Sequence, residues 1–244
     1  MSVDEVAVPI GPHEDEPHLS GLNNRLNWLR AAVLGANDGI VSTAGIVIGA
    51  VGATSERSAI VIAGVAGLAA GAMSMGAGEY VSVSTQRDTE RSLIAKETRE
   101  LAEEPEDELA ELAELYRQKG LSEELARQVA VELTGHDALR SHLDIELGID
   151  PDQLTNPWHA AWASMISFTL GAVLPLLTIL VFSADLRVAV TVVAVCVALA
   201  GTGYTSARIG GSSPRPAVTR VVIGGFLAMA VTYGIGSLVG AGIA

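Results

Sequence analysis

The sequence predicts an all-α, polytopic membrane protein with five transmembrane helices and a cytoplasmic helical domain inserted between helices two and three. The first observation is that apolar residues, 49% of the chain, are gathered into five long blocks. Each block reaches the roughly 20 residues that a helix needs to cross a bilayer core. The second is that residues 86–157 hold 19 of the 28 Asp and Glu and 8 of the 15 Lys and Arg.

The chain opens on an acidic, proline-containing stretch without the basic start and apolar core of a signal peptide. Residues 1–25 are therefore expected to be a disordered tail. Residues 26–85 should hold spans one and two, residues 86–157 the Glu-rich domain, and residues 158–244 spans three to five. The apolar blocks run over residues 31–53, 58–83, 160–183, 188–207 and 218–242.

Short connections at residues 54–57 and 184–187 predict two antiparallel hairpins, spans one with two and three with four. Arg and Lys gather on the side of the Glu-rich segment, which the positive-inside rule assigns to the cytoplasm. The C-terminus is then expected outside. Gly67 with Gly71, and Gly236 with Gly240, have the spacing of close helix contacts, either within one subunit or between copies.

The Glu-rich segment is predicted to be helical throughout. Span two has no breaker at its end and should continue to about residue 104 as one helix. Pro105 suits the start of the next helix and Gly120 its C-cap. Two further helices are expected over residues 122–134 and 137–147, with Gly135 and Gly148 as their stops.

Asp38 lies inside span one, because a helix beginning after it would leave only 15 residues, about 22 Å, before Thr54. Its alternative role is a turn or cap in Asn37-Asp38-Gly39. Glu79 lies eight residues before Arg87, as Asp38 lies eight after Arg30, which predicts matching depths.

Met75 shares a helix face with Glu79. A thioether beside carboxylates suits a first-row cation. Core packing for Met75 and an interfacial position for Glu79 remain the alternatives.

Two carboxylate pairs with i,i+3 spacing, Glu97 with Glu100 and Glu108 with Glu111, mark the Glu-rich domain. They are either solvated helix faces or converging cation ligands. No Glu-x-x-His motif of a di-iron bundle occurs, and no nucleophile–base pair indicates an enzyme. The acidic balance argues against nucleic acid as a partner, and the single Cys196 permits no disulfide within one chain.

With these residues in view, the chain resembles the vacuolar iron transporter family, which includes nodulin-like transporters. The resemblance rests on ANDGIVS in span one and GEYVSV at the end of span two. It implies a homodimer of five-span subunits with a path at their interface, which moves Fe²⁺, and sometimes Mn²⁺, out of the cytosol in exchange for protons. On matching positions, Asp38, Met75 and Glu79 would line that path.

The resemblance also implies that metal ligands of the Glu-rich domain match a set of five glutamates: Glu97, Glu100, Glu108, Glu111 and Glu146. Metal-binding members carry two methionines shortly before the last of these. Here His142 and Leu143 stand there, so His142 is a candidate replacement ligand and one soft ligand is lost.

The hypothesis is thus a transporter that exports Fe²⁺, or Mn²⁺ and related ions, and that holds no tightly bound cofactor. The alternative is a membrane-anchored protein that binds, stores or senses metal without transporting it. Arg outnumbers Lys 13 to 2, which favours the cell membrane of a prokaryote.

Overall fold

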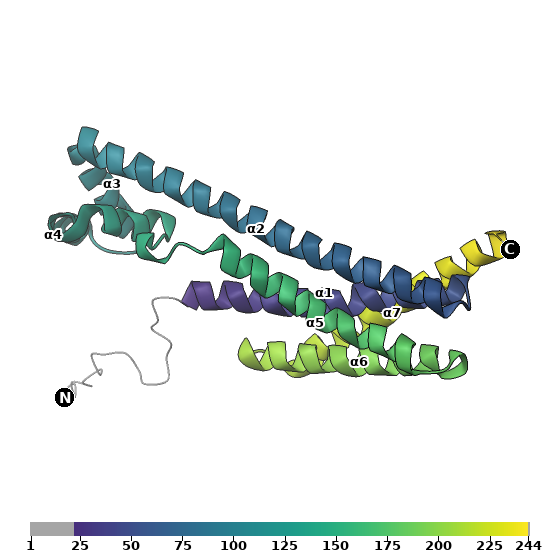
Figure 1. Ribbon diagram of the computed structural model, residues 1–244. Coiled ribbons are helices and arrows are strands. Elements are labelled where there is room, and N and C mark those ends of the chain that lie inside the picture. Colours follow the sequence, from purple (N-terminus) through teal and green to yellow (C-terminus); the bar gives the residue numbers. More distant parts are fainter. Residues whose placement is uncertain (1–21, 244) are drawn as a thin grey trace, which may run out of the picture.

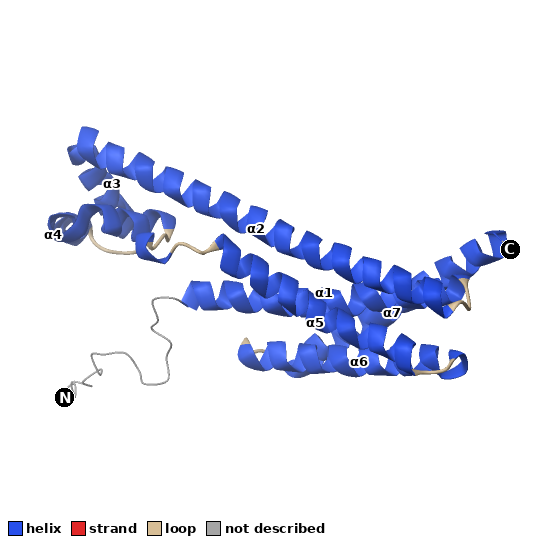
Figure 2. Ribbon diagram, viewed as in Figure 1, coloured by secondary structure: helices blue, strands red, loops and turns tan. Residues whose placement is uncertain are grey.

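The computed structural model describes residues 22–243, and every regular element within them is a helix (Figures 1 and 2). In chain order these elements are α1 (Leu22–Ala53), α2 (Arg57–Glu103), α3 (Pro105–Gln118), α4 (Glu123–His142), η1 (Leu143–Leu147), η2 (Pro151–Gln153), α5 (Pro157–Val181), α6 (Ala184–Ile209) and α7 (Pro214–Ile243). Most of the predicted tail lies outside the described residues. Its last four residues, 22–25, are helical instead, because no Gly or Pro separates them from the first span.

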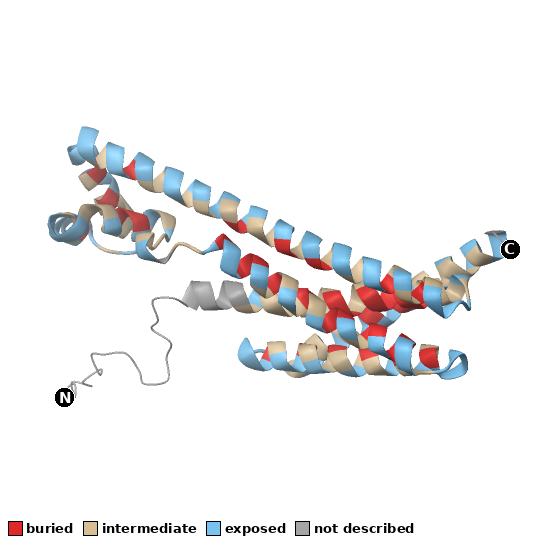
Figure 3. Cartoon of the chain, viewed as in Figure 1, coloured by how far each residue is buried: buried red, intermediate tan, exposed pale blue. Residues whose placement is uncertain are grey.

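The prediction of five membrane helices is confirmed: α1, α2, α5, α6 and α7 are each long and apolar enough to cross a bilayer. Large apolar side chains remain exposed on all five, including Ile46, Ile62, Leu170, Val197 and Leu238. Exposed apolar surface on this scale indicates contact with lipid rather than water. Buried residues lie along the seams where the helices meet (Figure 3).

Helix α1 is the centre of the bundle and packs closely on α5 because glycines face the contact. A Cβ added to Gly35 would lie 2.6 Å from the carbonyl oxygen of Ser164, and one added to Gly39 would collide with the backbone of Phe168. Small residues let two helix backbones approach in a membrane, where dispersion contacts replace the hydrophobic effect.

The glycine pairs noted in the sequence pack within the subunit. Gly67 faces Ile46 of α1, and Gly71 faces the ring of Phe168. On α7, Gly236 lies against Gly49 and Gly240 against Ala53. These contacts support the interpretation of close packing inside one subunit for both pairs.

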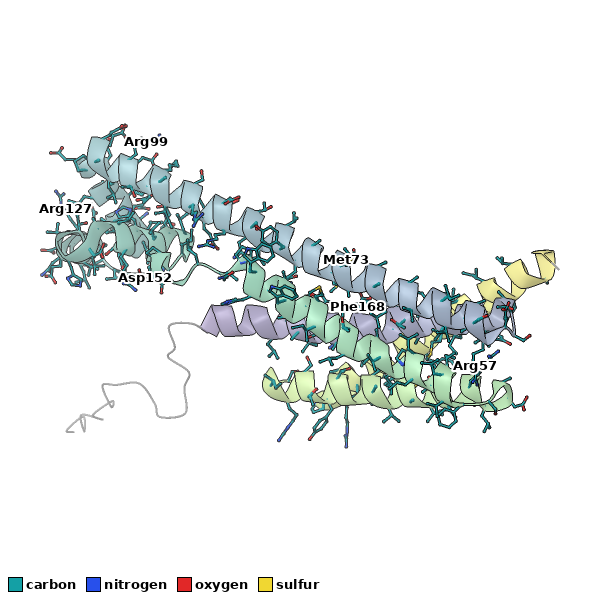
Figure 4. The ribbon with its side chains drawn as sticks, viewed as in Figure 1. Arg57, Met73, Arg99, Arg127, Asp152 and Phe168 are labelled. Atoms are coloured by element: carbon teal, nitrogen blue, oxygen red, sulfur yellow. The ribbon has the colours of Figure 1, made fainter. Side chains whose placement is uncertain are left out.

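Two arginines join the hairpin tips at the end of the bundle away from the Glu-rich segment. Arg57, labelled near that end in Figure 4, donates from Nη2 to the Phe182 carbonyl oxygen at 2.6 Å. Arg187 is buried and donates from Nη2 to the Ser55 carbonyl oxygen at 3.3 Å. Each hairpin thus supplies one cation that binds the other hairpin's loop.

Helix α2 runs on without interruption past the apolar part of the bundle, as its lack of breakers predicts (Figure 1). Its 47 residues correspond to about 70 Å. Helices α3 and α4 fold back beside its far end. We call residues 86–156, which include the end of α2, α3, α4, η1 and η2, the insert.

Local signals set the helix ends of the insert. Pro105 opens α3, and Gly120 and Gly148 take the positive φ angles of 104° and 63° that favour glycine. The predicted stop at Gly135 is wrong by two residues. Asp137 is the extended residue that kinks α4, and its Oδ1 accepts a hydrogen bond from the Arg140 backbone N–H, which caps the next helical turn.

Candidate functional site

Three side chains from three helices of the insert meet in a buried cluster. Glu97 comes from α2, Glu108 from the first turn of α3 and His142 from the end of α4. One ligand atom of each lies within 4.8 Å of the others. His142 Nδ1 is 3.0 Å from Glu97 Oε1 and 3.5 Å from Glu108 Oε2. We call these residues the buried triad.

The apolar core of the insert holds this triad in place. Leu112, Ala126, Ala130 and Leu143 are almost fully buried around the junction of α3 and α4. Leu143, which stands where the family resemblance implies a soft ligand, is therefore a packing residue. In Figure 4, the labelled side chains of the insert, Arg99, Arg127 and Asp152, lie at its periphery, and all three are exposed.

The triad leaves buried polar atoms unsatisfied. Glu97 Oε1 and both ring nitrogens of His142 have no hydrogen-bond partner among the described residues, since the close Nδ1–Oε1 pair is not aligned for one. Each such atom costs about 1–3 kcal/mol when buried. Two carboxylates and an imidazole form a donor set that suits first-row divalent ions. A cation bound among them would satisfy Glu97 Oε1 and His142 Nδ1, which face one another.

Burial disfavours the charged forms of the triad. Burial raises the pKa of Glu97 to about 7, and the charges of Glu146 and Glu108 add to the shift. Burial, followed by repulsion from Glu111, raises the pKa of Glu108. Burial lowers the pKa of His142. The nearby positive charge does not offset the effect of burial on these groups, and a metal ion would supply more.

The other predicted ligands lie around the triad. Glu111 and Glu146 are exposed and Glu100 is partly buried, yet all three charges raise the pKa of Glu97. Burial, then Glu111, raises the pKa of Glu146 itself. The structure thus brings all six predicted residues of the insert into one electrostatic neighbourhood, three in the interior and three at its rim.

Lys96 is a residue of this neighbourhood that the sequence interpretation missed. Its Nζ lies 2.6 Å from Glu100 Oε2, and its charge lowers the pKa of Glu108 and of Glu146 against the larger effects of burial. The i,i+4 spacing of Lys96 and Glu100 was the available signal. Lys96 holds Glu100 at the rim of the cluster.

In the membrane bundle, the three predicted path residues lie on α1 and α2. Asp38 is half-buried, and its Oδ1 accepts a hydrogen bond from Ser42 Oγ at 2.6 Å. The Glu79 side chain is 11% exposed, and Oε1 lies 3.5 Å from Arg30 Nη2. Met75 is partly buried and packs against the cluster of Ala72, Phe168 and Ala172.

The predicted matching depth of Asp38 and Glu79 is wrong. A Cβ on Gly35 would lie 2.6 Å from the Ser164 carbonyl oxygen, and one on Gly76 would lie 3.3 Å from Cβ of the next residue of α5. Gly35 and Gly76 therefore lie at the same depth in the bundle, because each contacts one of two successive residues of α5. Asp38 lies three residues deeper than Gly35, and Glu79 three residues shallower than Gly76, a separation of about 9 Å. Met75 falls near the depth of Asp38.

The two membrane carboxylates thus lie at different depths rather than at the same depth. Glu79 stands nearer the insert beside Arg30, and Asp38 stands deeper with Ser42. Arg30 and Ser42 were missed as partners. Ser42 follows Asp38 by four residues, which is a visible helical spacing, whereas the pairing of Arg30 with Glu79 depends on how two helices pack.

Comparison with known proteins supplies an independent line of evidence. The sequence model of the VIT family matches residues 29–237 of the chain. A vacuolar iron transporter from Acanthamoeba castellanii is 40% identical over 227 residues, which cover 92% of this chain and 83% of that protein. Vacuolar iron transporter homolog 5 from Oryza sativa subsp. japonica is 39% identical over 212 residues, 86% of this chain and 80% of its own length. Vacuolar iron transporter homolog 2.1 from Arabidopsis thaliana is 35% identical over 218 residues, 88% and 83% respectively.

Proposed function

The chain belongs to the VIT family, and from that premise we propose that it carries Fe²⁺ across the membrane, out of the cytosol, in exchange for protons. Mn²⁺ and related first-row divalent ions are further substrates in this proposal. Carboxylate, thioether and imidazole donors bind such ions, whereas Mg²⁺ and Ca²⁺ prefer oxygen alone.

The continuity of α2 is the observation that carries the proposal. Glu79 in the membrane part and Glu97 in the buried triad are 18 residues apart on this one helix. Eighteen residues make five turns, so the two carboxylates share a face about 27 Å apart. In this proposal, ion capture in the insert and ion passage through the bundle would lie along one continuous helix.

In the proposed cycle, the insert gathers the metal ion, and Glu79, Met75 and Asp38 then bind it at increasing depth. The path lies at the interface of a homodimer. Carboxylates bind either a metal ion or a proton, and competition for one site couples the two fluxes. A proton arriving from the far side releases the ion.

The proposed orientation puts the N-terminus and the insert in the cytoplasm and the C-terminus outside, following the placement of Arg and Lys. The proposed location is the cell membrane of a prokaryote, for which the excess of Arg over Lys is the support.

Metal uptake into proteoliposomes tests the proposal. With the insert facing outward, Fe²⁺ entry should rise when the lumen is more acidic than the medium. Asp38→Asn should reduce the rate at least tenfold, and Asp185→Asn, an exposed residue of the opposite end, should leave it unchanged. Fe²⁺ flux that does not depend on the pH gradient would contradict proton antiport. An unchanged flux in Asp38→Asn would contradict a role for Asp38 in the path.

A membrane-anchored storage or sensing protein is the second candidate, and the enclosure of the buried triad favours it. The exposed fractions of Glu97, Glu108 and His142 are 4%, 7% and 0%, so a bound ion would be shielded from water. A triple variant, Glu97→Gln, Glu108→Gln and His142→Asn, separates the two. Residual uptake with weakened affinity supports the transporter, whereas bound metal without any uptake in the unmodified protein supports storage.

A further inference from the structure

A cavity of about 420 Å³ opens between α1, α6 and α7 at the end of the bundle that carries the insert. Two arginines, Arg30 and Arg220, line it together with the uncharged polar residues Asn37, Thr202 and Ser206. Apolar side chains of α1 and α7 complete the wall. Its volume is in the range of small-ligand sites.

The charge of this cavity is opposite to that of the whole molecule. None of the described residues that line it is Asp or Glu, although the chain carries a formal charge of −13. After Asp185 the sequence has no acidic residue, and Arg208 and Arg215 flank the turn between α6 and α7. Such a cavity attracts anions and repels metal cations. Arg30 at its rim also pairs with Glu79 of the proposed ion path at 3.5 Å, so the cavity adjoins that path.

The two arginines bracket the cavity along the membrane normal. A Cβ on Gly225 of α7 would lie 3.5 Å from Val41 Cγ2 of α1, which makes these residues level. Arg220, five residues before Gly225, is then level with residues 36–37 and about 10 Å deeper than Arg30. Tyr204, half exposed on the same end of α6, is typical of headgroup level.

Asn37 provides a polar group that nothing in the described chain satisfies. Its Oδ1 is buried and has no hydrogen-bond partner among the described residues. Asn37 itself lines the cavity, so a hydroxyl donor in the cavity would satisfy this acceptor once the amide turns toward it. Leu34, which also lines the cavity, is 49% exposed, so the polar interior adjoins lipid-facing apolar surface.

We propose that this cavity binds the headgroup of an anionic phospholipid that carries free hydroxyls. The phosphate would lie between the guanidinium groups of Arg30 and Arg220, which bind phosphate through paired, charge-assisted hydrogen bonds. A headgroup hydroxyl would donate to Asn37, and the acyl chains would extend along the exposed apolar surface beside Leu34. Basic pockets between membrane helices are established sites for anionic headgroups.

Lipid titration of the full chain tests this site independently of transport. The protein in phosphatidylcholine nanodiscs is titrated with phosphatidylglycerol, and bound lipid is counted by native mass spectrometry while the thermal midpoint is recorded. Arg220→Gln should weaken phosphatidylglycerol binding about tenfold, since one charge-assisted contact is lost. Arg215→Gln removes the same charge from the same helix, but Arg215 does not line the cavity, so this variant should bind like the unmodified chain.

Two further variants separate the cavity from general surface charge and from loss of folding. Ser206→Leu keeps every arginine but narrows the cavity with a bulky apolar side chain, and should weaken binding while its midpoint in phosphatidylcholine alone stays near that of the unmodified chain. Asn37→Leu should abolish the preference for phosphatidylglycerol over phosphatidic acid, which lacks the headgroup hydroxyls.

The proposal is overturned if Arg215→Gln and Arg220→Gln weaken binding equally, or if Ser206→Leu binds phosphatidylglycerol normally. It is also overturned if inorganic phosphate raises the midpoint as much as the lipid does, because the site would then be one for the free anion. A Ser206→Leu protein that fails to fold leaves the comparison of the two arginine variants decisive.

Discussion

At the scale of single residues, the raised pKa of Glu97 makes the stability of the insert depend on pH. Its folded-state pKa is about 7 against an ordinary 4.5, because it is buried beside Glu146 and Glu108. The folded state therefore binds this proton more tightly than the unfolded state does. The resulting stabilisation is complete below pH 4.5 and is lost as pH rises through 7.

Metal binding should follow the opposite trend, because the ion binds the deprotonated carboxylate. We expect Mn²⁺ affinity, measured by calorimetry on the full chain, to rise between pH 5.5 and 7.5. Glu97→Gln should lower the affinity at least tenfold and flatten this rise. Glu103→Gln, an exposed residue of the same helix, is the matched control, and equal losses in both variants would contradict a role for the triad.

Leu143 gives a second prediction at this scale, because the structure makes it a packing residue. It is fully buried in the insert, so Leu143→Ala should destabilise the insert by about 2–5 kcal/mol through cavity formation. Leu143→Met conserves volume and should cost less than about 1.5 kcal/mol. Thermal unfolding followed by circular dichroism measures both. Equal midpoints for the Ala variant and the unmodified chain would show that the site is open to solvent.

At the scale of elements, the two basic residues at the hairpin tips, Arg57 and Arg187, have a structural role, because each binds the loop of the other hairpin. Arg187→Ala removes the bond to the Ser55 carbonyl from a buried position, and should cost about 1–3 kcal/mol. Arg57→Ala should lower the free energy of unfolding by less, because the hydrogen bond from Arg57 to Phe182 is exposed. Limited proteolysis at residues 54–56 measures the loosening. The cleavage rate should rise more in Arg187→Ala than in Arg57→Ala, and the reverse order would refute this account.

The elements also show what the sequence could and could not predict. Spans and their number followed from hydropathy, because bilayer thickness fixes helix length. Pro105, Gly120 and Gly148 marked helix ends through local backbone chemistry. The relative depth of Asp38 and Glu79 failed because α5 lies against both helices and sets their register, which no local pattern encodes. The buried triad was predicted in part, since Glu97, Glu108 and His142 were each named, but their convergence depends on how α2, α3 and α4 pack together.

At the scale of the whole molecule, negative and positive charges gather on different parts of the chain. The insert carries most of the negative charge, whereas the turn between α6 and α7 is purely basic. Both features lie at the same end of the bundle (Figure 1). A cation approaching this end is attracted to the insert and repelled from the basic turn. The long-range field thus draws cations toward the insert rather than toward the basic turn.

The rigid connection along α2 yields the last prediction, which rests on the proposed function. One alanine inserted after Arg91 rotates Glu97 by 100° relative to Glu79, whereas seven inserted residues rotate it by only about 20° while adding about 10 Å. Both insertions leave the triad's own contacts with α3 and α4 intact, so Mn²⁺ binding to the insert should persist in each. Fe²⁺ uptake should fall several-fold with one residue and recover in part with seven.

The comparison of the two insertions separates orientation from length. Equal uptake by the one-residue variant and the unmodified chain would show that the insert delivers ions through solution rather than along the shared face of α2. Equal loss in both variants would show that distance, or the short connection from η1 to α5, limits transport instead. Only the graded result requires Glu97 and Glu79 to face the same side of one continuous helix.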